Sequence, residues 1–152
     1  MKRVLFVCTG NICRSPTAEG VFRHLAVDAG IAVEADSAGT HGYHIGEPPD
    51  PRTVAAAARR GFDLNSLRAR RVKREDFNQF DLILAMDRGH LAHLETMRPQ
   101  DARAQVKLFL DYHPETKRDV PDPYYGGPEG FEHVLDLVEA ASRGLLDDLR
   151  TR

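Results

Sequence analysis

The chain opens with a short apolar run followed by a helical pattern. Residues 2–8 are nearly all apolar, which is typical of a central parallel strand covered on both faces. Ser15 and Pro16 then favour the start of a helix, and Gly30 its end. Between them, apolar side chains recur at helical spacing: Ala18, Val21, Phe22, Leu25, Ala26 and Ala29. Residues 31–37 alternate in the manner of a strand.

The middle of the chain repeats this alternation. Asp50 and Pro51 favour the start of an alanine-rich helix that Gly61 ends. Strands are predicted at residues 80–86 and 106–110, with a helix between them. The pattern therefore remains one of strands and helices in turn.

Two helices and one long loop complete the prediction. Asp87 is expected to cap the helix that carries Leu91 and Leu94. The last helix begins near Pro128 and presents one apolar stripe: Phe131, Val134, Leu135, Val138, Ala141, Leu145 and Leu149. The preceding loop, residues 111–130, is too long for a simple connection, and loops of this kind are often functional.

This alternation predicts an α/β fold. Consecutive strand and helix units favour a parallel sheet with right-handed crossovers, so we expect a three-layer open sheet of four parallel strands with helices on both faces. Ligands in such folds bind beyond the carboxyl ends of the strands, so the loop after the first strand is the place to look. Residues 1–152 together have the size of a single domain.

Composition and charge exclude several functions. The formal net charge is −2, with acids and bases interspersed, so no overall field indicates a nucleic-acid or membrane partner. No apolar run approaches the roughly 18–20 residues of a membrane span, and Met1-Lys2-Arg3 leads into the first strand without a signal-peptide pattern. A cytoplasmic location is expected. The local basic run at residues 68–74 is interpreted as a solvated face.

The loop after the first strand has the chemistry of an anion site. Cys8 ends the strand, and Arg14 follows after five residues, where the helix begins. A tight loop at a helix N-terminus directs backbone N–H groups and the positive end of the helix dipole at an anion. The same surroundings favour a cysteine thiolate. Arg14 can also offer two parallel N–H donors to phosphoryl oxygens. The loop is therefore predicted to bind phosphate.

Other residues of this loop fit the same interpretation. Gly10 and Asn11 tolerate the positive φ values that a tight loop can require. The Ser15 hydroxyl could either cap the helix or hydrogen-bond the Cys8 sulfur, and the sequence leaves both open. A Walker A loop is excluded because Arg14 follows Cys13 where that motif needs Gly-Lys.

A metal site is not expected. The chain has two cysteines, both in this loop, and no others to complete a zinc site. His90 and His93 are spaced three apart on a predicted helix, but no third ligand accompanies them. No cofactor is expected either.

A phosphoryl transfer also needs an acid for the leaving oxygen, because general acid catalysis typically contributes about 10²–10⁴-fold. The long loop offers Asp122, which Pro123 restrains to an extended backbone. Two aromatic residues follow at Tyr124 and Tyr125 and could form an apolar wall.

These motifs together resemble the low-molecular-weight protein tyrosine phosphatase family. The resemblance covers nearly the whole chain, through residues 4–16, 36–40, 42–50, 80–87 and 122–126. It implies a protein-tyrosine phosphatase that forms a cysteinyl-phosphate intermediate. In that mechanism Cys8 is the nucleophile and Arg14 clamps the phosphoryl group. Asp122 acts first as the acid and later as the base.

The resemblance also assigns supporting residues. The phosphate loop and its support comprise Thr9, Gly10, Asn11, Ile12, Cys13, Ser15 and Ser37. The substrate ring is expected against a rim of Ile12, Tyr43, Tyr124 and Tyr125. Cys13 resembles the second loop cysteine of the family, which can form a reversible disulfide with Cys8. One departure is Leu67, where many relatives carry a histidine that supports the loop asparagine.

Three other functions fit these residues less well. Arsenate reduction on this scaffold needs further cysteines, and none follows Cys13. Protein-arginine phosphatases place threonine where this loop has Ile12, an apolar residue that suits an aromatic ring better. A non-enzymatic phosphate-binding module requires neither Cys8 nor Asp122. The expected substrate is therefore a phosphotyrosine protein or aryl phosphate, with inhibition by phosphate-like oxyanions.

Overall fold

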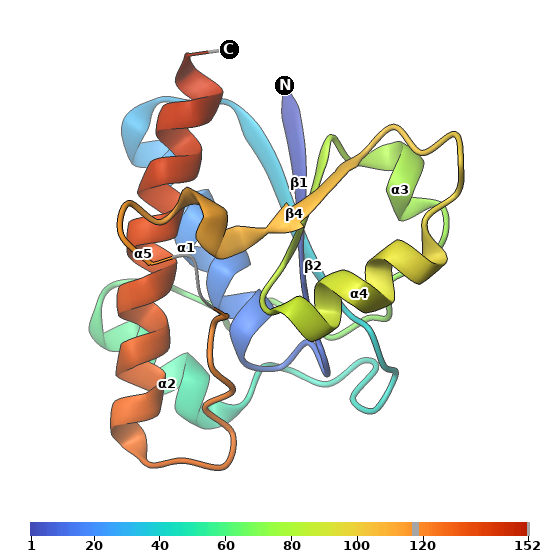
Figure 1. Cartoon of the computed structure of the whole chain (residues 1–152). Helices are drawn as coiled ribbons and strands as arrows, with labels where there is room; N and C mark the ends of the chain where they lie inside the picture. Colours follow the sequence, from blue (N-terminus) through green and yellow to red (C-terminus); the bar gives the residue numbers. More distant parts are fainter. Residues whose placement is uncertain (117–118, 152) are drawn as a thin grey trace.

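The computed structural model describes residues 1–116 and 119–151, in which strands and helices alternate (Figure 1). Residues 117–118, within the loop expected at 111–130, lie outside the described residues. The elements in chain order are β1 (Lys2–Cys8), α1 (Arg14–Ala29), β2 (Val33–Gly39), α2 (Pro51–Arg59), α3 (Asp76–Gln79), β3 (Leu82–Ala85), α4 (Arg88–Met97), β4 (Gln105–Leu108), the 3₁₀ helix η1 (Phe109–Tyr112) and α5 (Pro128–Arg150).

The described strands form one four-stranded parallel sheet in the order β2-β1-β3-β4. In Figure 1, α1, α2 and α5 lie on one side of the sheet, and α3 and α4 lie on the other. The expected fold class is confirmed. Cys8 pairs with Gly39, and Val7 pairs with Ala85, so the carboxyl ends of β1, β2 and β3 meet at one edge. The loop after β1 emerges at the point where strand order reverses.

Side chains of β1 alternate between two apolar cores. Phe6 packs edge-on against Phe22 of α1 and Phe109 of η1, with ring centroids 5.6 and 5.1 Å apart. Leu5 points into the opposite core, beside Phe77. This burial on both faces explains the continuous apolar run of the strand.

Local signals set most element ends. Gly30 has a φ of 70° and ends α1 as expected, since its N–H bonds the carbonyls of Ala26 and Val27. Asp50 and Asp87 cap α2 and α4 through side-chain hydrogen bonds to Arg52 N and His90 N, so both cap predictions are confirmed.

Three strand predictions differed from the structure at their ends. The strand expected over residues 80–86, β3, spans only Leu82–Ala85. β2 begins at Val33 rather than residue 31, because Ile31 N still donates to the Ala26 carbonyl at the end of α1. β4 ends at Leu108 rather than residue 110, because Phe109 begins the 3₁₀ turn. Within the described ranges, no helix combines the length and apolar character needed to cross a bilayer.

Candidate active site

The loop between β1 and α1 is held in an unusual backbone conformation. Asn11 has a φ of 61°, within the left-handed region. At Gly10, a Cβ would lie 2.9 Å from Cδ2 of His44, so a larger residue there would require the His44 side chain to shift. The positive φ expected for this loop is therefore found at Asn11 but not at Gly10.

Ser15 interacts with the cysteine rather than capping the helix. Helix α1 already begins at Arg14, its N-cap residue Cys13 makes no side-chain cap, and Ser15 is its second residue. The Ser15 Oγ lies 3.0 Å from the Cys8 Sγ. Asn11 Nδ2 donates to the same oxygen at 2.8 Å, so the serine proton can be directed at the sulfur, which is closer than its other acceptor, the Ala38 carbonyl at 3.4 Å. Of the two roles that the sequence left open for Ser15, the geometry favours the contact with the sulfur.

The loop forms the floor of a pocket of about 220 Å³. It is lined by Cys8, Thr9, Gly10, Ile12, Cys13, Arg14, Tyr43, His44, Asp122, Tyr124 and Tyr125. The sequence-based site residues absent from this lining, Asn11, Ser15 and Ser37, are buried behind the loop. His44 also lines the pocket, although no motif in the sequence predicted a role for it.

Arg14 is anchored from two distant segments. Its side chain is 6% exposed, and Nη1 donates to Asp87 Oδ2 at 2.9 Å and to the Val120 carbonyl at 3.1 Å. Although burial raises the pKa of Asp87, the His90 amide together with the hydrogen bond and charge of Arg14 brings it below its ordinary value. Asp87 was expected only as a helix cap. It caps α4 through Oδ1 and fixes the guanidinium through Oδ2.

The carboxylate of Asp122 lies at the pocket mouth. Its side chain is 44% exposed, and Oδ2 is 3.8 Å from Arg14 Nη2. Tyr124 N donates to Oδ1 at 3.0 Å, which orients the carboxylate from within its own loop. One oxygen is thus held by the backbone, and the other faces the arginine and the pocket.

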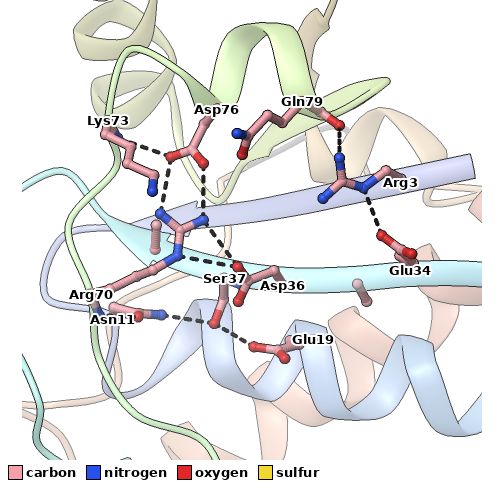
Figure 2. A network of polar contacts seen from close by, with 12 residues as sticks. Arg3, Asn11, Glu19, Glu34, Asp36, Ser37, Arg70, Lys73, Asp76 and Gln79 are labelled. Atoms are coloured by element: carbon pink, nitrogen blue, oxygen red, sulfur yellow. Dashed lines mark hydrogen bonds and ion pairs between the residues drawn. The ribbon is translucent and has the colours of Figure 1, made fainter.

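A chain of buried polar groups supports Asn11 (Figure 2). Asn11 Nδ2 also donates to Ser37 Oγ at 2.9 Å, and Ser37 Oγ donates to Glu19 Oε1 at 2.7 Å. Burial raises the pKa of Glu19, while hydrogen bonds and charge from Ser37 and Arg23 oppose that shift. The loop asparagine is therefore tied to β2 and α1 together.

The other side of Asn11 is held by Arg70. The Arg70 N–H donates to Asn11 Oδ1 at 3.0 Å, and its guanidinium bonds Asp36 and Asp76, each at 3.0 Å (Figure 2). The solvated-face interpretation was wrong for this residue of the basic run. Leu67 packs against the apolar core. The hydrogen bond to the Asn11 side-chain oxygen comes instead from the backbone amide of Arg70.

The two cysteines are free and buried. Burial raises the pKa of the Cys13 thiol to about 12, partly offset by the neighbouring Thr53 hydroxyl and reinforced by the charge of Asp50. Cys13 is thus held as a thiol. Among residues 1–116 and 119–151, no three His, Cys, Asp or Glu side chains gather into a metal-binding group.

A buried thiol on the floor of an anion-binding loop, beside an arginine and a carboxylate, is the site of a cysteine-dependent phosphatase class. Comparisons with known proteins agree with this class of site. The family model described as low molecular weight phosphotyrosine protein phosphatase matches residues 3–152. The chain belongs to this family, which confirms both the resemblance and the expected enzyme class, a protein-tyrosine phosphatase.

Three similar proteins illustrate this membership. The low molecular weight protein-tyrosine-phosphatase of Streptomyces coelicolor is 52% identical, over 97% of this chain and 93% of its own. The protein tyrosine phosphatase of Entamoeba histolytica, solved with Hepes in the active site, has a TM-score of 0.95 and 36% identity, over 99% and 98% of the chains. A Drosophila arginine phosphatase has a TM-score of 0.92 and 30% identity, over 98% of each chain.

Proposed function

We propose that this phosphatase hydrolyses protein phosphotyrosine in two steps at Cys8. In the first step, the Cys8 thiolate attacks phosphorus, the bond from phosphorus to the phenolic oxygen breaks, and Asp122 gives its proton to that oxygen. In the second step, the Asp122 carboxylate takes a proton from water as the water oxygen attacks phosphorus. The phosphorus–sulfur bond then breaks, which releases phosphate and the thiolate.

The contact between Cys8 Sγ and Ser15 Oγ carries this proposal. At 3.0 Å, the serine hydroxyl can stabilise a thiolate, and the N-terminus of α1 adds the positive end of its dipole. Arg14 lines the same pocket. Its Nη1 is bonded and one Nη2 proton faces Thr9 and His90, which leaves Nε and the second Nη2 proton for phosphoryl oxygens. The three groups of the two-step reaction thus share one cavity.

The pocket mouth suits an aromatic phosphate ester. Tyr43 and Tyr125 are 70% and 89% exposed, and Tyr124 packs edge-on against Tyr125 with ring centroids 5.0 Å apart. With Ile12, these rings offer apolar surface to a phenyl group. We infer that phosphotyrosine proteins and aryl phosphates are substrates and that phosphate-like oxyanions inhibit. The sulfonate of Hepes in the Entamoeba active site supports the last point.

Cys13 is proposed as a redox partner. A peroxide would oxidise the Cys8 thiolate to a sulfenic acid, and the Cys13 thiol would displace water from it to form a disulfide. Because the pKa of Cys13 is raised to about 12, we expect this second step to be slow at neutral pH. Cys13→Ser should keep catalysis but lose recovery of activity when dithiothreitol is added after peroxide.

The decisive experiment replaces Cys8 by serine in metal-free buffer. We expect at least about 10³-fold loss of kcat on a phosphotyrosine peptide, with Cys13→Ser as the matched control that keeps most activity. Substantial activity in the Cys8 variant would rule out the covalent mechanism.

Substrate choice needs a second comparison on one preparation of the wild-type enzyme. Phosphotyrosine, phosphoserine and phosphoarginine peptides of one sequence should be hydrolysed with phosphotyrosine strongly preferred. Preference for phosphoarginine, the substrate class named for the Drosophila protein, would contradict the argument from Ile12.

A further inference from the structure

His90 lies where the phosphate loop and the arginine meet. It belongs to the first turn of α4 and is 5% exposed. Its Nε2 is 2.8 Å from Thr9 Oγ1 and 3.4 Å from Arg14 Nη2, and the latter two atoms are 3.5 Å apart. None of the roles assigned above to the phosphate loop, the clamp or the acid accounts for this buried imidazole.

The neighbours of the ring decide which nitrogen carries the proton. Arg14 Nη2 is only a donor, so a proton on Nε2 would face another proton, whereas a lone pair there accepts. On the opposite side, Nδ1 has no well-aligned hydrogen bond, and its nearest acceptor is Asp87 Oδ1 at 3.2 Å. A lone pair on Nδ1 would face that carboxylate. Both arguments place the proton on Nδ1 and the lone pair on Nε2.

The imidazole is also kept neutral. Burial, followed by the charge of Arg14, lowers the pKa of His90 to about 4, against the opposing pull of Asp87, Asp122 and Asp119. A neutral ring can accept a hydrogen bond at Nε2 throughout the physiological pH range. A charged ring could not.

We propose that His90 is a positioning residue for the phosphoryl clamp, acting through an Nε2 lone pair that accepts from the Thr9 hydroxyl and faces Arg14 Nη2. Thr9 Oγ1 and His90 Nε2 together draw one Nη2 proton away from Asp122, whose Oδ2 lies 3.8 Å from the same nitrogen. The guanidinium therefore keeps one orientation instead of collapsing onto the acid. This inference rests on the clamp role proposed above for Arg14.

The test compares two replacements of His90. His90→Gln can place an amide oxygen near the position of Nε2, whereas His90→Met fills the space without an acceptor. We expect His90→Met to lower kcat/KM on a phosphotyrosine peptide and weaken inhibition by inorganic phosphate, each about tenfold, with His90→Gln within about threefold of wild type. His133→Met, at an exposed position of α5, is the matched control and should leave both constants unchanged.

Two outcomes of that comparison would overturn the proposal. Equal losses in both His90 variants would indicate packing alone, and wild-type constants in both would indicate no role. Thermal unfolding should be measured for each variant. If His90→Met does not fold, the proposal is tested by the kinetic constants of the Gln variant and by the tautomer spectrum of the wild-type enzyme.

The tautomer can be read in the wild-type enzyme. A long-range ¹H–¹⁵N spectrum at pH 7 should show His90 protonated at Nδ1 and unprotonated at Nε2. Protonation at Nε2 would overturn the proposal. Arg14→Lys separates this inference from the proposed function. If that variant binds inorganic phosphate as wild type does, the clamp role of Arg14 fails, while the tautomer spectrum still reports on His90.

Discussion

Asn11 combines a backbone conformation and a set of hydrogen bonds that can be separated by mutation. Its φ of 61° disfavours most side chains, and its amide bonds Ser15, Ser37 and Arg70. We expect Asn11→Ala and Asn11→Gly both to lose at least about tenfold in kcat, because both lose these bonds. Glycine should recover about 1 kcal/mol of unfolding free energy relative to alanine, as measured by urea denaturation.

If Asn11→Gly kept full activity, the loop would depend on its φ value and not on the polar chain behind it. If the glycine and alanine variants were equally stable, the left-handed conformation would carry no cost in the folded enzyme.

Asp122 should be most important for substrates whose leaving groups need a proton. We expect Asp122→Asn to slow a phenyl phosphate of high leaving-group pKa by about 10²–10⁴-fold and a nitrophenyl phosphate far less. The measurement is kcat across a leaving-group series. A uniform loss over the series would count against the acid role. The Tyr124 N–H that orients the carboxylate can also bond the asparagine oxygen, so the replacement is expected to keep the position of the side chain.

At the scale of elements, α5 packs closely against η1 at one position. A Cβ on Gly144 would collide with the Tyr112 carbonyl oxygen. Alanine normally stabilises a helix by about 1 kcal/mol over glycine, but overpacking costs about 1–3 kcal/mol, so we expect Gly144→Ala to destabilise the enzyme. Thermal unfolding provides the measurement.

Gly130 in the first turn of α5 is the control for this change. A Cβ there would meet Pro123 Cβ at 3.7 Å, an ordinary contact, so Gly130→Ala should be neutral or stabilising. A stabilised Gly144→Ala would show that η1 can move away from the helix.

The elements were readable from sequence where one local signal dominated. The apolar run of β1, the glycine at the end of α1 and the aspartate caps each act within a few residues. The strand ends depended on backbone hydrogen bonds and turns that the apolar pattern does not report, such as the bond from Ile31 N to the end of α1 and the 3₁₀ turn that begins at Phe109. The four-residue α3 has too few positions to show a periodic pattern.

The same distinction applies to the site. Cys8, Arg14 and Asp122 stand in recognisable local motifs, and the fold brings them to one pocket. Arg70 and His90 are ordinary surface-type residues in sequence, and only the parallel arrangement of β2, β1 and β3 places them behind the loop. Their partners are 59 and 81 residues away, so no local pattern could reveal them.

For the whole molecule, His90 links stability to pH. Its pKa falls to about 4 on folding, from an ordinary value near 6.5, so the unfolded chain binds more protons between these values. Stability is therefore lost as pH falls from about 6.5 to 4. We expect His90→Gln to gain on the order of 2–3 kcal/mol of unfolding free energy relative to wild type between pH 7 and pH 4.

Denaturant unfolding of both proteins across this pH range provides the measurement. The raised pKa of Glu19 has the opposite sign, but it is common to both proteins and cancels in the difference. A constant difference between the two stability curves would show that His90 titrates normally in the folded enzyme.

The bond from Arg14 to the Val120 carbonyl also has a consequence for synthesis. Val120 N in turn donates to the Met86 carbonyl just after β3, so a segment 106 residues beyond Arg14 along the chain completes the site. A ribosome-bound chain that ends before residue 119 contains Cys8, Arg14 and Asp87 but lacks both the Val120 carbonyl and Asp122. We therefore expect dephosphorylation to begin only after the segment that carries Val120 and Asp122 has been synthesised.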